Sequence, residues 1–128
     1  MTRFLWICLG GALGTGARYL VSGWASKALG ASFPFGTLAV NVLGSFLVAG
    51  LMYAGTESTA IPPTARLVLT TGVMGGFTTY SAFSYETMRY LQDGAWVLAV
   101  VNVLVTVLAC ISACLLGWAA AKWLLGVG

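Results

Sequence analysis

The sequence predicts an all-α integral membrane protein with four membrane-spanning helices in each subunit. Hydrophobic residues make up 59% of its 128 residues and charged residues only 7%, whereas soluble globular domains carry roughly 25% charged residues. The apolar residues form four runs, each close to the length of about 20 residues that crosses a hydrocarbon core. Because little sequence lies between the runs, we expect a single transmembrane domain, residues 1–128, in a multi-pass protein of the cell membrane.

Three of the expected spans are continuous apolar helices. The first, about residues 4–24, contains Gly10 and Gly14, whose four-residue spacing forms a small face that another helix can approach closely. The second covers about residues 36–53 and the fourth about residues 95–125. The segments between the spans are short and contain glycine, serine and proline, which is typical of turns.

The third expected span, about residues 66–91, is predicted to be broken near its middle. Its centre reads Gly75-Gly76-Phe77-Thr78-Thr79-Tyr80-Ser81-Ala82-Phe83-Ser84. Adjacent glycines weaken a helix, and a run of hydroxyl side chains competes for the hydrogen bonds of the backbone. Irregular backbone at membrane depth is tolerated only where it faces protein or a water-filled cavity. We therefore expect the break to line an ion pathway.

The distribution of positive charge predicts insertion in both orientations. Four spans place both termini on one side of the membrane, and each side then holds three basic residues: Arg3, Arg66 and Lys122 against Arg18, Lys27 and Arg89. The excess of basic residues on one side, which normally sets the orientation of a membrane protein, is therefore absent. The expected assembly is an antiparallel, dual-topology homodimer with two-fold symmetry.

The composition argues against several classes of function. The absence of histidine rules out histidine-ligated haem and the usual zinc sites. The basic residues are scattered along the sequence and form no cluster of the kind that binds nucleic acid. The three cysteines lie in apolar runs and are expected to be small buried residues. Only three acids are present (Glu57, Glu86 and Asp93), with no catalytic constellation, so we do not expect an enzyme.

What remains near the predicted break is a set of neutral hydrogen-bond donors and aromatic rings. The candidates are Asn41, Thr78, Thr79, Tyr80, Ser81, Phe83, Ser84, Asn102 and Thr106. Donors without acids suit an anion, and the positive edge of an aromatic ring adds to them. Asn102, Thr106 and Cys110 are spaced by four, which indicates either one wall of a pathway or hydrogen bonding between helices. Carbonyl groups between Gly75 and Thr78 would instead suit a cation.

Three motifs, in this order, resemble the Fluc (CrcB-type) fluoride channels. They are Gly10-Gly11-Ala12-Leu13-Gly14 with Arg18-Tyr19, then Phe35-Gly36-Thr37-Leu38-Ala39-Val40-Asn41, then residues 75–84 with Glu86. The resemblance covers the first three spans, while the fourth matches only in length and character. It implies an antiparallel homodimer in the lipid membrane that conducts fluoride passively and selectively out of the cell, relieving fluoride toxicity.

The resemblance also implies roles for particular residues. The fluoride pathway would include Asn41, Tyr80, Ser81 and Phe83. The polar residues spaced by four in the fourth span, which we call the polar stripe, add Asn102 and Thr106. A structural Na⁺ on the two-fold axis would be held by the backbone carbonyls of Gly75 and Thr78. Arg18 and Glu86 are candidate structural or vestibule residues; Arg18 is equally compatible with snorkelling to the headgroups. Tyr80 and Ala82 depart from the phenylalanine and threonine usual in the family.

Two other functions stay open at this stage. A small dual-topology, proton-coupled multidrug exporter shares the length, the span count and the charge balance, and it would depend on Glu86 because such exporters need an acid at bilayer depth. A non-transporting assembly subunit of a larger membrane complex would show no ion flux by itself.

Overall fold

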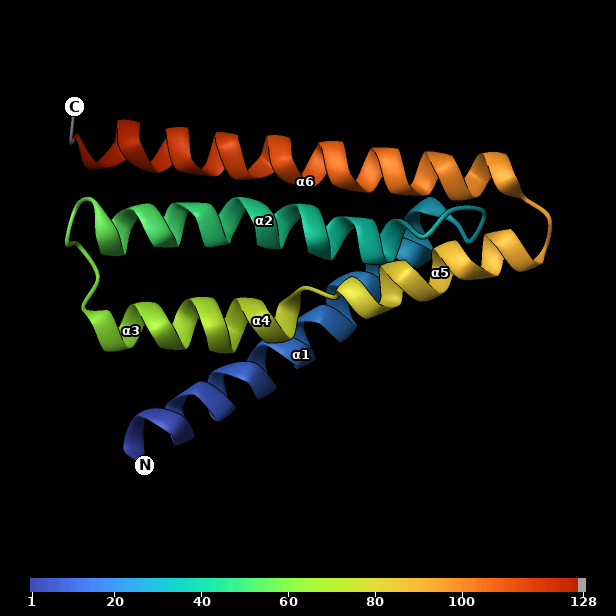
Figure 1. Ribbon diagram of the computed structural model, residues 1–128. Helices are drawn as coiled ribbons and strands as arrows, with labels where there is room; N and C mark the ends of the chain where they lie inside the picture. The colour runs from blue at the N-terminus through green and yellow to red at the C-terminus, as the bar shows by residue number, and fades with distance from the viewer. Residues whose placement is uncertain (127–128) are drawn as a thin grey trace.

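The computed structural model describes residues 1–126, which form helices and short connections without any strand (Figure 1). The elements are α1 (Thr2–Leu29), α2 (Phe35–Thr56), α3 (Pro63–Leu67), the π-helix η1 (Val68–Met74), α4 (Gly75–Phe77), α5 (Tyr80–Gln92) and α6 (Trp96–Leu125). The expected all-α fold is therefore confirmed. Three of these helices, α1, α2 and α6, are long and apolar enough to cross a membrane.

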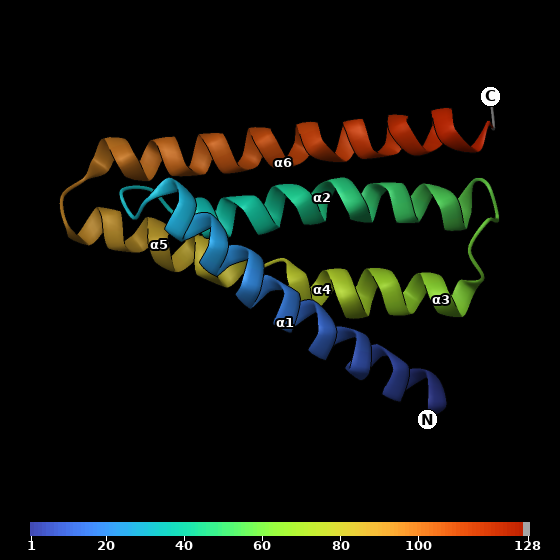
Figure 2. The same cartoon turned by 180° about the vertical axis from the view of Figure 1, so that it is seen from behind.

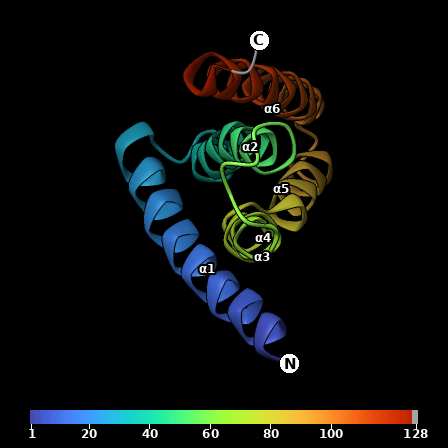
Figure 3. The ribbon, with the colours of Figure 1, turned by 90° about the vertical axis from the view of Figure 1, so that its left-hand side faces the viewer.

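The helices lie roughly side by side, and α2 forms the centre of the bundle. α2 and α6 run in the same direction and are the most extensively packed pair, while the segment from α3 to α5 runs back in the opposite direction beside α2 (Figures 1 and 2). Viewed from one end, α1 crosses the other helices obliquely on the side away from α6 (Figure 3). Both ends of the described chain lie at the same end of the bundle.

Large apolar side chains cover the outer surface of the long helices. On α6, Leu104, Leu108 and Leu115 are each more than half exposed. In water such a surface would be unfavourable, whereas in a bilayer it faces acyl chains. Cys8 is also exposed, so the expectation that all three cysteines are buried is wrong for this one; Cys110 and Cys114 are half-buried.

Glycines allow α1 to cross η1 and α4 in direct backbone contact. A Cβ atom placed on Gly14 would lie 2.0 Å from the Val73 carbonyl oxygen, and one on Gly76 would lie 2.4 Å from the Gly11 carbonyl oxygen. A Cβ atom on Gly10 would lie 3.1 Å from the Val68 carbonyl oxygen. The close-packing face predicted at Gly10 and Gly14 is thus confirmed.

The interruption in the third apolar run lies near the middle of the run, within residues 75–84, but it is shorter than the sequence indicated. Gly75 and Gly76 are helical, and only Thr78 (ψ 159°) and Thr79 (φ −151°) are extended. Ser81 already belongs to α5, which begins directly after Thr79. The expectation that the two glycines break the helix is wrong, because Gly76 serves the contact with α1 and keeps helical geometry.

The residues before the interruption form a π-helix that the sequence did not predict. The Gly75 N–H closes it by donating to the carbonyls of both Gly72 and Thr70. The Thr70 hydroxyl also donates to the Arg66 carbonyl at 2.9 Å. π-Helical turns are frequent at functional sites. Among the continuous spans, α1 and α2 extend beyond their expected ranges, whereas α6 begins one residue later than expected and ends at the expected residue.

We predict that Gly14→Ala destabilises the protein by about 2 kcal/mol, as expected for overpacking a tight contact. The added methyl would overlap the Val73 carbonyl and force α1 away from η1. The measurement is the thermal unfolding midpoint of the purified protein in detergent. Gly16→Ala is the matched control, because a Cβ there meets nothing within 4 Å. Equal midpoints for the two variants would contradict the prediction.

Candidate functional site

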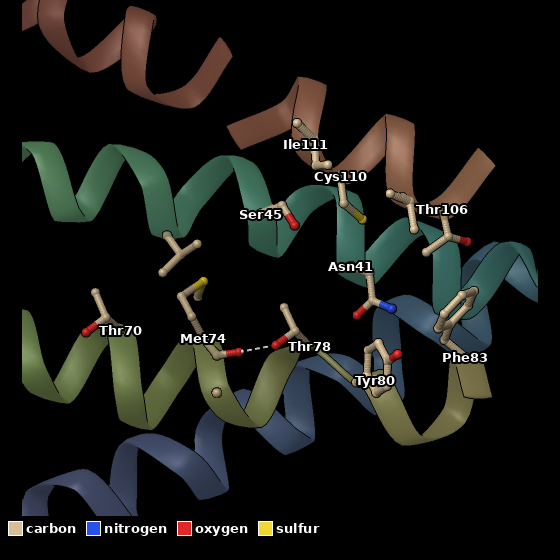
Figure 4. A pocket seen from close by; sticks show the side chains of 13 residues that line it. Asn41, Ser45, Thr70, Met74, Thr78, Tyr80, Phe83, Thr106, Cys110 and Ile111 are labelled. Atoms are coloured by element: carbon tan, nitrogen blue, oxygen red, sulfur yellow. Dashed lines mark hydrogen bonds between the residues drawn. The ribbon is translucent and has the colours of Figure 1, made fainter. Parts of the chain in front are cut away.

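An open groove of about 470 Å³ lies between α2, α6 and the segment from η1 to α5 (Figure 4). It combines polar groups with apolar ones, and none of its lining residues is charged. The lining consists of Asn41, Ser45, Val48, Thr70, Met74, Gly75, Thr78, Tyr80, Phe83, Thr106, Val107, Cys110 and Ile111. The groove thus brings together six of the eight predicted pathway or cation residues: Asn41, Gly75, Thr78, Tyr80, Phe83 and Thr106.

Asn41 of α2 is bonded twice to the interrupted backbone. Its Nδ2 donates to the Thr79 carbonyl at 3.0 Å, and its Oδ1 accepts from the Thr79 N–H at 2.7 Å. The side-chain amide therefore pairs with Thr79 as a neighbouring strand would. Asn41 is only 9% exposed, yet a side-chain amide has two N–H donors, so one remains for the groove.

The interruption changes what the neighbouring carbonyl groups can bind. In a continuous α-helix the N–H of residue 79 would donate to the Gly75 carbonyl, and the N–H of residue 82 to the Thr78 carbonyl. Here the Thr79 N–H donates to Asn41, and the Ala82 N–H donates to the Thr79 hydroxyl at 3.2 Å. The Gly75 and Thr78 carbonyls thereby lose their usual helical donors.

These two carbonyl groups are the ones the sequence assigned to a cation, and both residues line the groove. Within residues 1–126, no group of three or more acidic, cysteine or histidine side chains could hold a metal. A cation here would have to use neutral oxygens, which suit a hard ion such as Na⁺.

The aromatic pair follows directly after the interruption. The rings of Tyr80 and Phe83 are 5.6 Å apart between centroids and inclined by 61°, an edge-to-face arrangement. Phe83 is 8% exposed and Tyr80 79% exposed, and both line the same end of the groove (Figure 4). Ser81 lies on the exposed side of α5, with its hydroxyl 3.4 Å from that of Thr79, and does not line the groove.

The polar stripe of α6 is divided between two surroundings. Thr106 and Cys110 line the groove, whereas Asn102 is 1% exposed and turns toward α5. The Asn102 amide donates to the Thr87 hydroxyl at 3.0 Å, and its Oδ1 accepts from Thr106 at 3.4 Å. The sequence analysis had not singled out Thr87, although its spacing of four from Phe83 places the two residues on one face of α5.

Arg18 and Glu86 lie on the other side of the interruption. The Thr37 hydroxyl donates to Glu86 Oε1, while Glu86 Oε2 is buried and has no hydrogen-bond partner within residues 1–126. Arg18 lines a second groove, of about 410 Å³, in which Thr37 and Thr79 also take part. Thr78 lines the first groove and Thr79 the second, so both grooves reach the interrupted backbone.

The apolar helices and the uncharged polar groove define a small all-α membrane protein with an interrupted helical segment. The chain belongs to the CrcB family: the family model described as "CrcB-like protein, Camphor Resistance (CrcB)" matches residues 5–118.

Relatives of similar length cover nearly the whole chain. The chain is 54% identical to the fluoride-specific ion channel FluC of Anaeromyxobacter dehalogenans, over 98% of this chain and 100% of the relative. It is 50% identical to FluC of Citrifermentans bemidjiense, over 91% and 94% of the two chains, respectively. It is 47% identical to FluC of Sorangium cellulosum, over 98% of both chains.

We predict that Asn41→Leu lowers the free energy of unfolding by about 2 kcal/mol or more, because two buried backbone groups of Thr79 lose their partners. The measurement is unfolding of the purified protein in detergent. Ser45→Ala, one turn further along the same groove wall, is the control and should change stability much less. A stable Asn41→Leu variant would show that water or the backbone itself replaces the amide.

Proposed function

We propose that this protein is a passive, fluoride-selective channel of the cell membrane, not an enzyme, and that it exports fluoride to relieve its toxicity. The observation that carries the proposal is the match, along nearly the whole chain, to relatives named fluoride-specific ion channels. The uncharged, donor-containing groove supports it, because a carboxylate in the wall would repel an anion.

The physical task of such a channel is to replace the water that fluoride binds tightly. The groove offers the remaining Asn41 N–H, the hydroxyl group of Tyr80 and the positive edge of the Phe83 ring. Thr106 also lines the groove, but its single O–H donates to Asn102. Cys110 adds only a weak S–H donor. Ser81 and Asn102 stand apart from the groove, so we assign them to its neighbourhood and not to its wall.

The functional unit we propose has four membrane crossings per subunit and two subunits in opposite orientations. The interrupted segment, residues 63–92, runs alongside α2 and would form the remaining crossing (Figure 1). In a single chain the groove is open, and exposing the Gly75 and Thr78 carbonyls to lipid without their helical donors would be costly. An inverted second copy would cover them, and the equal charge count permits either orientation.

A structural Na⁺ at the two-fold axis belongs to the same proposal. The Gly75 and Thr78 carbonyls, freed from their helical donors, would hold it together with those of the second copy. The ion would supply positive charge that binds the two interruptions together. Arg18, in the groove on the other side of Thr79, would add positive charge at the approach to the pathway, and Glu86 would support the wall through Thr37.

We predict that Phe83→Ile reduces fluoride efflux from liposomes at least about tenfold, since the ring edge that replaces part of the hydration shell is lost. Efflux is followed with a fluoride electrode, and chloride efflux is recorded in parallel. Phe4→Ile is the matched control, because Phe4 is 61% exposed on the outside of α1. The exporter alternative predicts instead a proton-driven flux of cationic drugs that Glu86→Gln abolishes.

We predict that replacing Na⁺ by K⁺ lowers the thermal unfolding midpoint of the unaltered protein, because an ion that binds only the folded state stabilises it. In Asn41→Leu the difference between the two salts should shrink, because the extended backbone beside the Gly75 and Thr78 carbonyls is no longer held by the amide that pairs with Thr79. The salt-dependent difference is the quantity compared, which removes the general effect of the substitution. Identical midpoints in both salts for the unaltered protein would refute the sodium site.

A further inference from the structure

We propose that Thr87 is a positioning residue that fixes the Phe83 ring at the groove by tying the Phe83 carbonyl of α5 to Asn102 of α6. The inference rests on the proposed function, because it assigns Thr87 to the selectivity of the same pathway. It also gives Asn102 a different role from a contact with the passing ion.

The Thr87 hydroxyl is fixed from both sides. Its single O–H donates to the Phe83 carbonyl at 2.8 Å, and its oxygen accepts from Asn102 Nδ2 at 3.0 Å. Asn102 is 1% exposed, and its Oδ1 accepts from Thr106, which lines the groove. A continuous line of hydrogen bonds thus runs from the groove wall on α6 to the backbone that carries the aromatic ring.

These hydrogen bonds matter because α5 is not joined to the preceding helix by continuous helical backbone. The extended residues Thr78 and Thr79 separate α5 from the preceding helix, so helical continuity does not fix its first turns. Asn41 holds Thr79, and the principal neighbour of α5 is α6. The bridge through Thr87 therefore sets the distance and rotation of the turn carrying Phe83 relative to α6.

Other threonines make the same bond to their own helix without the link to a second one. Thr56 donates to the Met52 carbonyl at 2.7 Å, four residues earlier, on an exposed turn of α2. Thr56→Val therefore removes an equivalent intrahelical bond while leaving α5 and α6 untouched. It is the matched control for Thr87→Val, which has nearly the same shape as threonine but lacks the hydroxyl.

The functional test compares fluoride and chloride efflux from liposomes containing the unaltered protein, Thr87→Val, Thr87→Ser and Thr56→Val. We expect Thr87→Val to lose roughly tenfold in fluoride efflux and to lower the fluoride-to-chloride ratio, as misplacement of a positioned group does. Thr87→Ser keeps the hydroxyl and should restore both values. Asn102→Leu should resemble Thr87→Val, and the double variant should show no further loss, because both remove one bridge.

A second measurement follows the ring itself and does not depend on conduction. Phe83→4-fluorophenylalanine provides a ¹⁹F resonance that we expect to be single in the unaltered background and in Thr56→Val. Thr87→Val should shift or split it. An unchanged resonance in Thr87→Val, an unchanged efflux ratio, or failure of Thr87→Ser to rescue would overturn the inference. If the unaltered protein conducts no fluoride while the resonance responds as expected, the positioning stands and the proposed channel function fails.

Discussion

The pairing of the Asn41 amide with the Thr79 backbone is the interaction on which the site depends. A membrane interior supplies no water to an interrupted helix, so each freed N–H and C=O group needs a partner within the protein. Asn41 satisfies both groups of Thr79, and the Thr79 hydroxyl accepts from the Ala82 N–H in the first turn of α5. The interruption can then consist of only two residues, and Gly75 and Thr78, whose carbonyls are left over, both line the groove.

The apolar runs predicted the helices well, because length and hydrophobicity are what a bilayer selects. The position of the break was predicted only approximately. Glycine has low helix propensity, but Gly76 is needed where α1 lies against α4, and a tertiary contact outweighs propensity. The threonines interrupt the helix instead: Thr78 is extended after α4, and Thr79 is the N-cap of α5. The π-helix of residues 68–74 has no sequence signal that separates it from an α-helix.

The site, too, could be predicted from the sequence only in part. A spacing of four correctly put Asn102, Thr106 and Cys110 on one face of α6, but spacing does not tell which neighbour each residue meets. Thr106 and Cys110 meet the groove, whereas Asn102 lies deeper and meets Thr87. For Asn102 the structure shows hydrogen bonding between helices, while its part in the pathway stays a prediction. Thr87 could not be chosen beforehand, because its partner lies on another helix.

The charge of the groove wall and the opening of the groove toward lipid both bear on how the protein assembles. Its wall contains no carboxylate that would repel an anion, but its polar groups are not enclosed by one chain. A polar groove that opens toward lipid is stable only if something covers it. In the proposed four-span arrangement the basic residues divide equally between the two sides, so an inverted copy would meet no charge bias against its insertion. The same absence of charge bias would therefore make available the partner that we propose to close the groove.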